Sequence, residues 1–302
     1  MPAYIPKPPF AVRLPMTLTQ KIYAVNNVQL QVTTAGAANQ PLLLFLHGFP
    51  EIGLSWRQQL LFFAEQGFYA VAPDQRGYNR SSKPQKVKAY TLTHLTADIA
   101  ALIRQLTTGQ VYLVGHDWGG AVAWAMAQHY PELIHKLIIL NMPHPVVLHE
   151  HLKNSGRQRL RSWYVGFFQV PFLPEWLCRA FHFKILESSV VQTAWPHTFS
   201  RQTLALYKKA WQQPGALRSM INWYRAYKYD PLTGKDKINV PTLLIWGKQD
   251  KFLSAAMAQP SIDQCRDGRL EFLDKATHWL HHEQPDVVNN LILDFIKTES
   301  PA

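Results

Sequence analysis

Residues 115–120 read Gly115-His116-Asp117-Trp118-Gly119-Gly120 and lie between two contrasting segments. The apolar run 111–114 precedes them, and the alanine-rich stretch 121–127 follows. A strand, a sharp turn and a helix in this order predict a nucleophile elbow, in which the turn presents a reactive side chain. The nucleophile position holds Asp117, where esterases carry serine. Because a carboxylate attacks a saturated carbon and forms an alkyl-enzyme ester, the elbow favours epoxides or alkyl halides over esters.

Strands and helices are predicted to alternate on both sides of this elbow, as a mostly parallel sheet requires. Before and just after it we expect a hairpin around Asn26-Asn27, strands at 42–46, 69–72 and 137–140, and helices near 55–65 and 93–106. Farther along the chain we expect strands at 242–246 and 270–273 and a final helix at 285–297.

The pattern changes between these two groups of elements. Residues 144–237 are rich in aromatic and basic side chains, show helical spacing and contain no segment typical of a buried strand. We therefore predict an α/β fold whose mostly parallel central sheet is flanked by helices. Residues 1–143 and 238–302 would form the core, and residues 144–237 an inserted helical cap.

Composition limits the class of protein. The 302 residues are 47% hydrophobic and 17% charged, which predicts a large core and excludes a disordered chain. Cys178 and Cys265 have no metal-ligand spacing, and we interpret them as reduced thiols. Residues 1–9 contain no apolar run typical of a secretory signal, and no stretch of about 18 apolar residues predicts a membrane span. These features together favour the cytoplasm.

The formal net charge of +11 raises the question of nucleic-acid binding. The densest run of basic residues in the sequence is 153–161, but no nucleic-acid-binding motif accompanies it. We predict a solvated helix face there and no nucleic-acid partner. The alternative is an electrostatic contact with an anionic lipid surface beside the apolar stretch 167–172.

Two further residues complete a candidate catalytic triad with Asp117. In a fold with this elbow the order along the chain is nucleophile, acid and histidine. Asp250 and His278 each follow a predicted core strand, and ligands bind at the carboxyl ends of strands in open α/β sheets. The competing residues close to these positions are Asp230, Asp236, His281 and His282.

The chain as a whole resembles the epoxide hydrolase branch of the α/β hydrolases. The resemblance rests on His47-Gly48-Phe49-Pro50, the elbow, Asn222-Trp223-Tyr224-Arg225 and His278, and it spans nearly the whole length. The resemblance implies a cis bond before Pro50. An oxyanion hole needs two backbone donors, for which we predict the amides of Phe49 and Trp118.

Two cap tyrosines complete the site that the resemblance implies. In epoxide hydrolases such a pair holds the ring oxygen, and the matching residues here are Tyr224 and Tyr164, the latter before Phe167-Phe168-Gln169. A phenol suits this task because it keeps its proton at neutral pH. We expect Trp118, Phe49, Trp223 and Phe168 to contact the substrate, a small apolar epoxide that reacts with water. No cofactor and no metal is expected.

Two alternatives remain open from the sequence. A haloalkane dehalogenase uses the same nucleophile, and the Trp118 indole could donate to a halide, but halide release needs no acid such as the tyrosine pair. Fluoroacetate dehalogenases are disfavoured because they place arginine where this chain has Trp118. A non-catalytic binding protein with this fold is the third interpretation, and the complete triad argues against it.

Overall fold

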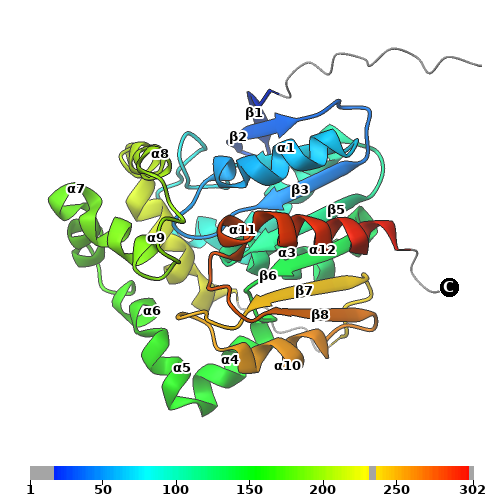
Figure 1. The fold of residues 1–302 in the computed structure, drawn as a ribbon. Helices are drawn as coiled ribbons and strands as arrows, with labels where there is room; N and C mark the ends of the chain where they lie inside the picture. The colour runs from blue at the N-terminus through cyan, green and yellow to red at the C-terminus, as the bar shows by residue number, and fades with distance from the viewer. Residues whose placement is uncertain (1–16, 231–235, 299–302) are drawn as a thin grey trace, which may run out of the picture.

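One eight-stranded sheet lies between two layers of helices in the computed structural model, which describes residues 17–230 and 236–298 (Figure 1). The expectation that residues 1–9 carry no secretory signal falls outside the described residues, and so do residues 231–235 of the predicted cap. In sequence order the strands are β1 (Thr19–Val25), β2 (Val28–Ala35), β3 (Leu42–Leu46), β4 (Tyr69–Pro73), β5 (Val111–His116), β6 (Ile134–Leu140), β7 (Thr242–Gly247) and β8 (Gly268–Leu273).

The sheet is mostly parallel, which confirms the predicted fold class. The strand order across it is β1-β2-β4-β3-β5-β6-β7-β8. β1 and β2 form the expected antiparallel hairpin, and Asn26 in its turn has a φ of 49°. Strands β3 to β7 are buried almost throughout, because helices cover both faces and leave no side that favours polar residues.

Successive side chains of the central strands pack into two separate hydrophobic cores. In β3, Leu43 and Phe45 face the core that includes Leu60 of α1 and Ile292 of α12, whereas Leu44 faces the other core. The helices outside the cap are α1 (Arg57–Glu65), α2 (Leu92–Leu106), α3 (Trp118–His129), α10 (Ala258–Ile262), α11 (Leu280–Glu283) and α12 (Pro285–Lys297). Short 3₁₀ turns are η1 (Gly53–Trp56), η2 (Val87–Tyr90), η3 (Pro131–Leu133), η4 (Tyr227–Tyr229) and η5 (Ala255–Met257).

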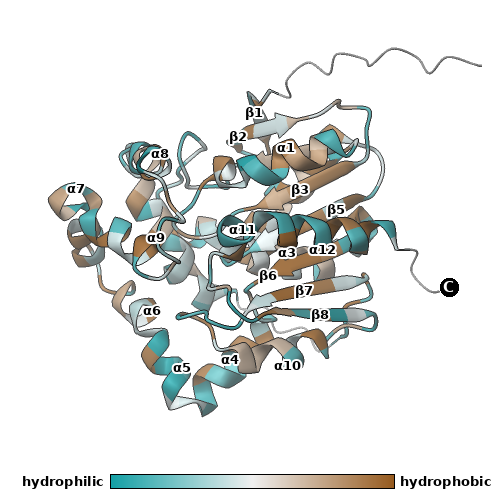
Figure 2. Ribbon diagram, in the orientation of Figure 1, coloured by the Kyte–Doolittle hydropathy of each residue, from teal (hydrophilic) through white to brown (hydrophobic). Residues whose placement is uncertain are grey.

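The described residues between β6 and β7, where the sequence predicts a cap, form six α-helices. They are α4 (Pro145–Asn154), α5 (Gly156–Arg161), α6 (Trp163–Phe167), α7 (Leu173–Val191), α8 (Arg201–Trp211) and α9 (Ala216–Ala226). α7 is kinked, because Phe181, His182 and Phe183 have positive φ values. Buried residues of α7, α8 and α9 join the larger hydrophobic core, and α5, α6 and α7 follow one edge of the molecule (Figure 2). The limits of 144 and 237 for a separate cap domain remain a prediction.

The position of the site follows from the strand order. The chain moves from β3 to β4 on one side and then returns to place β5 on the other side of β3. The loops after β3 and β5 therefore diverge at a switch point, which is where open α/β sheets bind ligands. Both free cysteines are buried, as reduced thiols would be, and the compartment stays a prediction. Within the described residues, no helix combines the length and apolar character needed to cross a membrane.

Candidate active site

Asp117 occupies a strained turn between β5 and α3. Its φ of 50° and ψ of −124° lie outside the usual regions for a residue with a side chain, at a cost of about 1–3 kcal/mol. The turn is tight enough to require small neighbours: a Cβ on Gly119 would lie 2.1 Å from the carbonyl oxygen of Leu46. A Cβ on Gly115 would lie 2.4 Å from the carbonyl oxygen of Gly119. The glycines of the motif thus allow the backbone to present Asp117.

Asp250 and His278 reach Asp117 from the loops after β7 and β8. The distance from His278 Nε2 to Asp117 Oδ2 is 3.6 Å, and that from His278 Nδ1 to Asp250 Oδ2 is 2.7 Å. Backbone amides of Phe252 and Leu253 donate to the second oxygen of Asp250, at 2.7 and 2.9 Å. The carboxylate of Asp250 is therefore fixed from both sides, and it orients the imidazole toward Asp117.

These charges act on one another's protonation. Although burial lowers it, the carboxylates of Asp250 and Asp117 raise the pKa of His278 to about 10. Although burial raises it, the hydrogen bond and charge of His278 lower the pKa of Asp117 below its usual value. At neutral pH the resting site therefore holds an ionised Asp117 beside a protonated His278.

The turn after β3 supplies a backbone donor to the same carboxylate. The amide N–H of Phe49 donates to Asp117 Oδ1 at 2.8 Å. The Phe49–Pro50 bond is cis, as the resemblance implies. Because Oδ1 accepts this bond and Oδ2 faces His278, the two oxygens of Asp117 have different surroundings.

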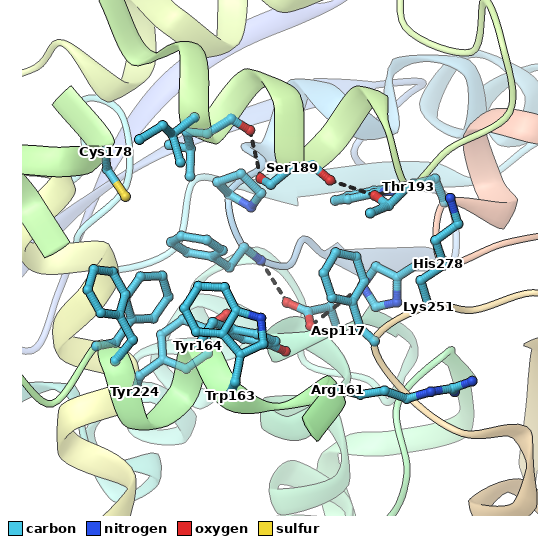
Figure 3. A pocket seen from close by; sticks show the side chains of 18 of the residues that line it. Asp117, Arg161, Trp163, Tyr164, Cys178, Ser189, Thr193, Tyr224, Lys251 and His278 are labelled. Carbon is cyan, nitrogen blue, oxygen red and sulfur yellow. Dashed lines mark hydrogen bonds and ion pairs between the residues drawn. The ribbon is translucent and has the colours of Figure 1, made fainter. Parts of the chain in front are cut away.

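Tyr164 of α6 and Tyr224 of α9 extend from the cap toward Asp117 (Figure 3). Their ring centroids lie 5.9 Å apart. Burial and the charge of Asp117 raise the pKa of each phenol well above its usual value, so both keep their protons. With Asp117 and His278, the two tyrosines line a cavity of about 370 Å³. Most of its other lining is apolar and includes Phe49 and Phe168.

A second, smaller cavity shares three lining residues with the larger one. Its volume is about 80 Å³, and its walls also include Asp117, Tyr164 and Tyr224. Trp118 and Leu148 line this smaller cavity but not the larger one. The reactive groups therefore stand where two chambers of unequal size meet.

The structure corrects the expectation that Trp223 contacts substrate. Its side chain is fully buried and lines neither cavity. The indole N–H donates to the carbonyl of Arg76 at 3.0 Å, and the ring packs against Tyr78. Consecutive residues of α9 point in different directions, so Tyr224 faces the cavity while Trp223 joins α9 to the core.

The competing histidines and aspartates have other partners. His282 Nε2 lies 2.6 Å from Glu51 Oε1, and the ring of buried His281 stacks on Trp56 with centroids 4.5 Å apart. Asp230 accepts a hydrogen bond from the backbone of Thr93, and Asp236 is exposed. None of these four residues contacts Asp117 through the interactions described.

Sequence reasoning missed Glu51, a fully buried carboxylate directly behind the site. Its Oε1 accepts a hydrogen bond from Tyr207 of α8 at 2.7 Å in addition to the contact with His282. Although burial raises it, His282 and His281 lower the pKa of Glu51 well below its usual value. The only signal in the sequence is that Glu51 follows the Phe49-Pro50 turn.

The carboxylate of Glu51 and the two neighbouring histidines are also of the types that bind metal ions. Glu51, His281 and His282 each offer a ligand atom within 4.8 Å of the others. However, ligands bound to one ion at about 2.0–2.1 Å lie roughly 3 Å or more apart. The direct 2.6 Å contact between Glu51 and His282 instead fits a hydrogen bond. We interpret the cluster as a hydrogen-bonded link between the cap and the core.

The elbow, the sheet and the helical insertion define the chain as a hydrolase with an α/β architecture, and a family model of the alpha/beta hydrolase fold matches residues 41–285. The chain belongs to this family, within its epoxide hydrolase branch, whose enzymes hydrolyse an ether bond. Epoxide hydrolase 4 of Homo sapiens is 37% identical over 91% of this chain and 77% of its own length. The AB hydrolase superfamily protein YfhM of Bacillus subtilis is 41% identical over 91% and 96%. A solved epoxide hydrolase from Bacillus megaterium superposes with a TM-score of 0.84 at 30% identity, covering 92% of this chain and 100% of that one.

Proposed function

We propose that the protein hydrolyses a small apolar epoxide to a vicinal diol through a covalent ester on Asp117. The observation that carries the proposal is the pairing of two protonated phenols with an ionised carboxylate at one cavity. Opening an epoxide requires these two functions, a nucleophile at carbon and an acid at oxygen. A departing halide needs no proton, so the tyrosines favour epoxide chemistry over dehalogenation.

In the first half-reaction Asp117 Oδ2 attacks a ring carbon. The carbon–oxygen bond of the ring breaks, and the ring oxygen takes a proton from Tyr164 or Tyr224. Asp117 Oδ1 becomes the carbonyl oxygen of the ester and keeps the hydrogen bond from Phe49. The unequal surroundings of the two carboxylate oxygens support this assignment.

In the second half-reaction a water molecule attacks the carboxyl carbon of Asp117. Because the ester has removed the charge of Asp117, His278 first gives its resting proton to the phenolate left by ring opening. The neutral imidazole then takes one proton from the water, with Asp250 stabilising the imidazolium that forms. Negative charge develops on Oδ1, where the Phe49 amide already points, and we assign the second donor to the Trp118 amide. The bond between the carboxyl carbon and Oδ2 breaks, so Oδ2 leaves in the diol with the proton from His278. The other proton of the water is released as the carboxylate of Asp117 re-forms, and it returns to His278, which restores the resting site.

The lining of the larger cavity favours an aryl substituent. Phe49, Phe167 and Phe168 surround the route to Asp117 and offer ring faces and edges for stacking. The Bacillus megaterium enzyme, in a mutant form, has been solved with (R)-3-[1]naphthyloxy-propane-1,2-diol, an aryl diol. We therefore choose aryl epoxides as test substrates.

A double substitution, Tyr164→Phe with Tyr224→Phe, tests the assignment. It removes both acids but keeps both rings for packing, so styrene oxide hydrolysis should fall at least about a hundredfold, as when an oxyanion donor is lost. The measurement is diol release and, in parallel, bromide release from a bromoalkane, with Tyr229→Phe at an exposed tyrosine as control. Near-native diol release by the double variant would refute the role of the tyrosines. Bromide release that exceeds diol release in the native protein would favour the dehalogenase.

A further inference from the structure

Helices α5 to α7 of the cap carry a concentration of exposed apolar side chains. The five most exposed large hydrophobic residues of the described chain all lie between residues 160 and 181, although this segment is a small part of it. We name the following side chains the cap patch: Leu160, Trp163, Phe172, Trp176, Phe181 and Ile185. Their exposed fractions run from 46% to 83%. Isolated exposed hydrophobic residues are ordinary, but a concentration of aromatic ones marks an interaction surface.

Half of the cap patch lies at the larger cavity. Leu160, Trp163 and Ile185 line that cavity and are also exposed, so they form its outer rim. Figure 3 shows Trp163 and Arg161 at the cavity that leads to Asp117. Phe172 and Trp176 stand one helical turn apart at the start of α7, next to this rim in the chain. Whatever covers the cap patch therefore also faces the route to the active site.

Basic residues accompany the cap patch. Segment 153–184 carries Lys153, Arg157, Arg159, Arg161, Arg179 and Lys184. Nearby acids are neutralised within the cap: Glu175 pairs with Arg225 at 2.5 Å, and Glu187 pairs with Lys208 at 3.0 Å. Lys184 also pairs with Glu187, at 3.4 Å, whereas the other five basic residues form no salt bridge within the described part of the chain. Because these cations and the exposed aromatic side chains belong to the same helical segment, the surface matches an interface that is apolar below and anionic above.

We propose that the cap patch docks onto the surface of a membrane that contains anionic lipids. The aromatic side chains would enter the boundary between headgroups and acyl chains, and the arginines would bind the lipid phosphates. A second copy of the chain fits less well, because a twofold dimer would place the same basic surface on itself. The proposal concerns binding and does not depend on the reaction at Asp117. It would bring the cavity entrance to the phase in which apolar compounds concentrate.

Flotation of the full-length protein with vesicles tests the proposal. Vesicles of phosphatidylcholine with phosphatidylserine should bind the protein, whereas vesicles of phosphatidylcholine alone should bind it much more weakly. Added salt should release the protein, because screening weakens attraction between exposed charges. Failure to bind the anionic vesicles, or equal binding to both kinds, would overturn the proposal.

Two double variants separate the apolar from the charged contribution. Phe172→Ser with Trp176→Ser should abolish most of the binding. Arg157→Gln with Arg159→Gln should weaken it about tenfold or more. The matched controls, Ile22→Ser with Val287→Ser and Lys86→Gln with Lys297→Gln, change exposed residues elsewhere and should bind like the native protein. Far-UV circular dichroism checks the fold of each variant.

The same variants test the alternative that a second copy of the chain covers the cap patch. Analytical ultracentrifugation without lipid should show the same oligomeric state for the native protein and for Phe172→Ser with Trp176→Ser. A native dimer that this variant converts to monomer would assign the cap patch to self-association and overturn the lipid proposal. Unchanged vesicle binding by the arginine variant would equally exclude the electrostatic contact.

Discussion

At the residue scale, the two halves of the proposed reaction depend on different side chains. The attack on carbon needs Asp117 and the phenols, while removal of the ester needs His278 as a base. Replacement of His278 by glutamine should therefore leave the first half-reaction active and stop the second. Intact-mass measurement after addition of an epoxide should show one substrate adduct, and peptide mapping should place it on Asp117. Steady turnover by His278→Gln would transfer the role of the base to another residue.

The protonation of His278 leads to a second prediction at this scale. The pKa of about 10 depends on the negative charges of Asp250 and Asp117. Formation of the ester removes the charge of Asp117, so the pKa of His278 should fall and the imidazole should become a base when it is needed. Rapid-quench measurements should show ester decay that rises with pH and levels off well below pH 10. A rise that continues to pH 10 would show that the ester leaves His278 unchanged.

At the element scale, α8 holds the cap to the turn that carries Phe49. Tyr207 donates to Glu51, and the indole of Trp211 donates to the carbonyl of Pro50 at 2.7 Å. Arg57 at the start of α1 donates to Thr203 of α8 at 3.0 Å. The turn that positions the Phe49 amide is thus supported from the cap, whereas α5 to α7 carry the exposed surface.

Tyr207→Phe tests this support. Loss of a buried hydrogen bond to a charged group costs about 1.5–3 kcal/mol, because Glu51 keeps its charge and loses a donor. Urea unfolding should show a decrease of that size in the free energy of unfolding. Tyr229→Phe, at an exposed position, should change it by no more than about 0.5 kcal/mol. Equal stability of the two variants would mean that Glu51 does not depend on Tyr207.

The buried strands and the elbow were predictable because their signals are local: apolar runs and glycines next to Asp117. The helical character of the described part of the insertion, residues 144–230, was predictable from spacing. The contacts of Glu51 were not, because α8, α11 and the turn after β3 are far apart in the sequence. The direction of Trp223 was missed because α9 is buried on more than one face, so its pattern does not distinguish core from cavity.

At the scale of the whole molecule, the buried ion pair makes stability depend on pH. His278 has a pKa of about 10 in the folded protein and about 6.5 when unfolded. Its stabilisation is fully present below about pH 6.5, and it is lost as pH rises through about 10 because the folded state holds the extra proton. From pH 6.5 to 9.5, the free energy of unfolding of the native protein should therefore fall more than that of His278→Gln. The expected difference is on the order of 1 kcal/mol or more.

Urea unfolding of both proteins at the two pH values measures this difference, and all other titrating groups are common to the pair. Parallel curves would mean that His278 does not carry its proton in the resting protein. That outcome would also remove the basis for the predicted pH dependence of ester decay.

Because two chambers of unequal size meet at Asp117, the protein should select epoxides by the sizes of the two substituents on the ring. An epoxide bound with its ring between the tyrosines and the carboxylate must send its two ends in different directions. One substituent would enter the cavity of about 370 Å³ and the other the cavity of about 80 Å³. The smaller cavity therefore limits the size of the second substituent much more strictly. Terminal epoxides and those with a methyl-sized second substituent should be hydrolysed, whereas epoxides with two bulky substituents should react poorly. Discrimination between epoxides would then depend on the length of the substituent that enters the smaller cavity.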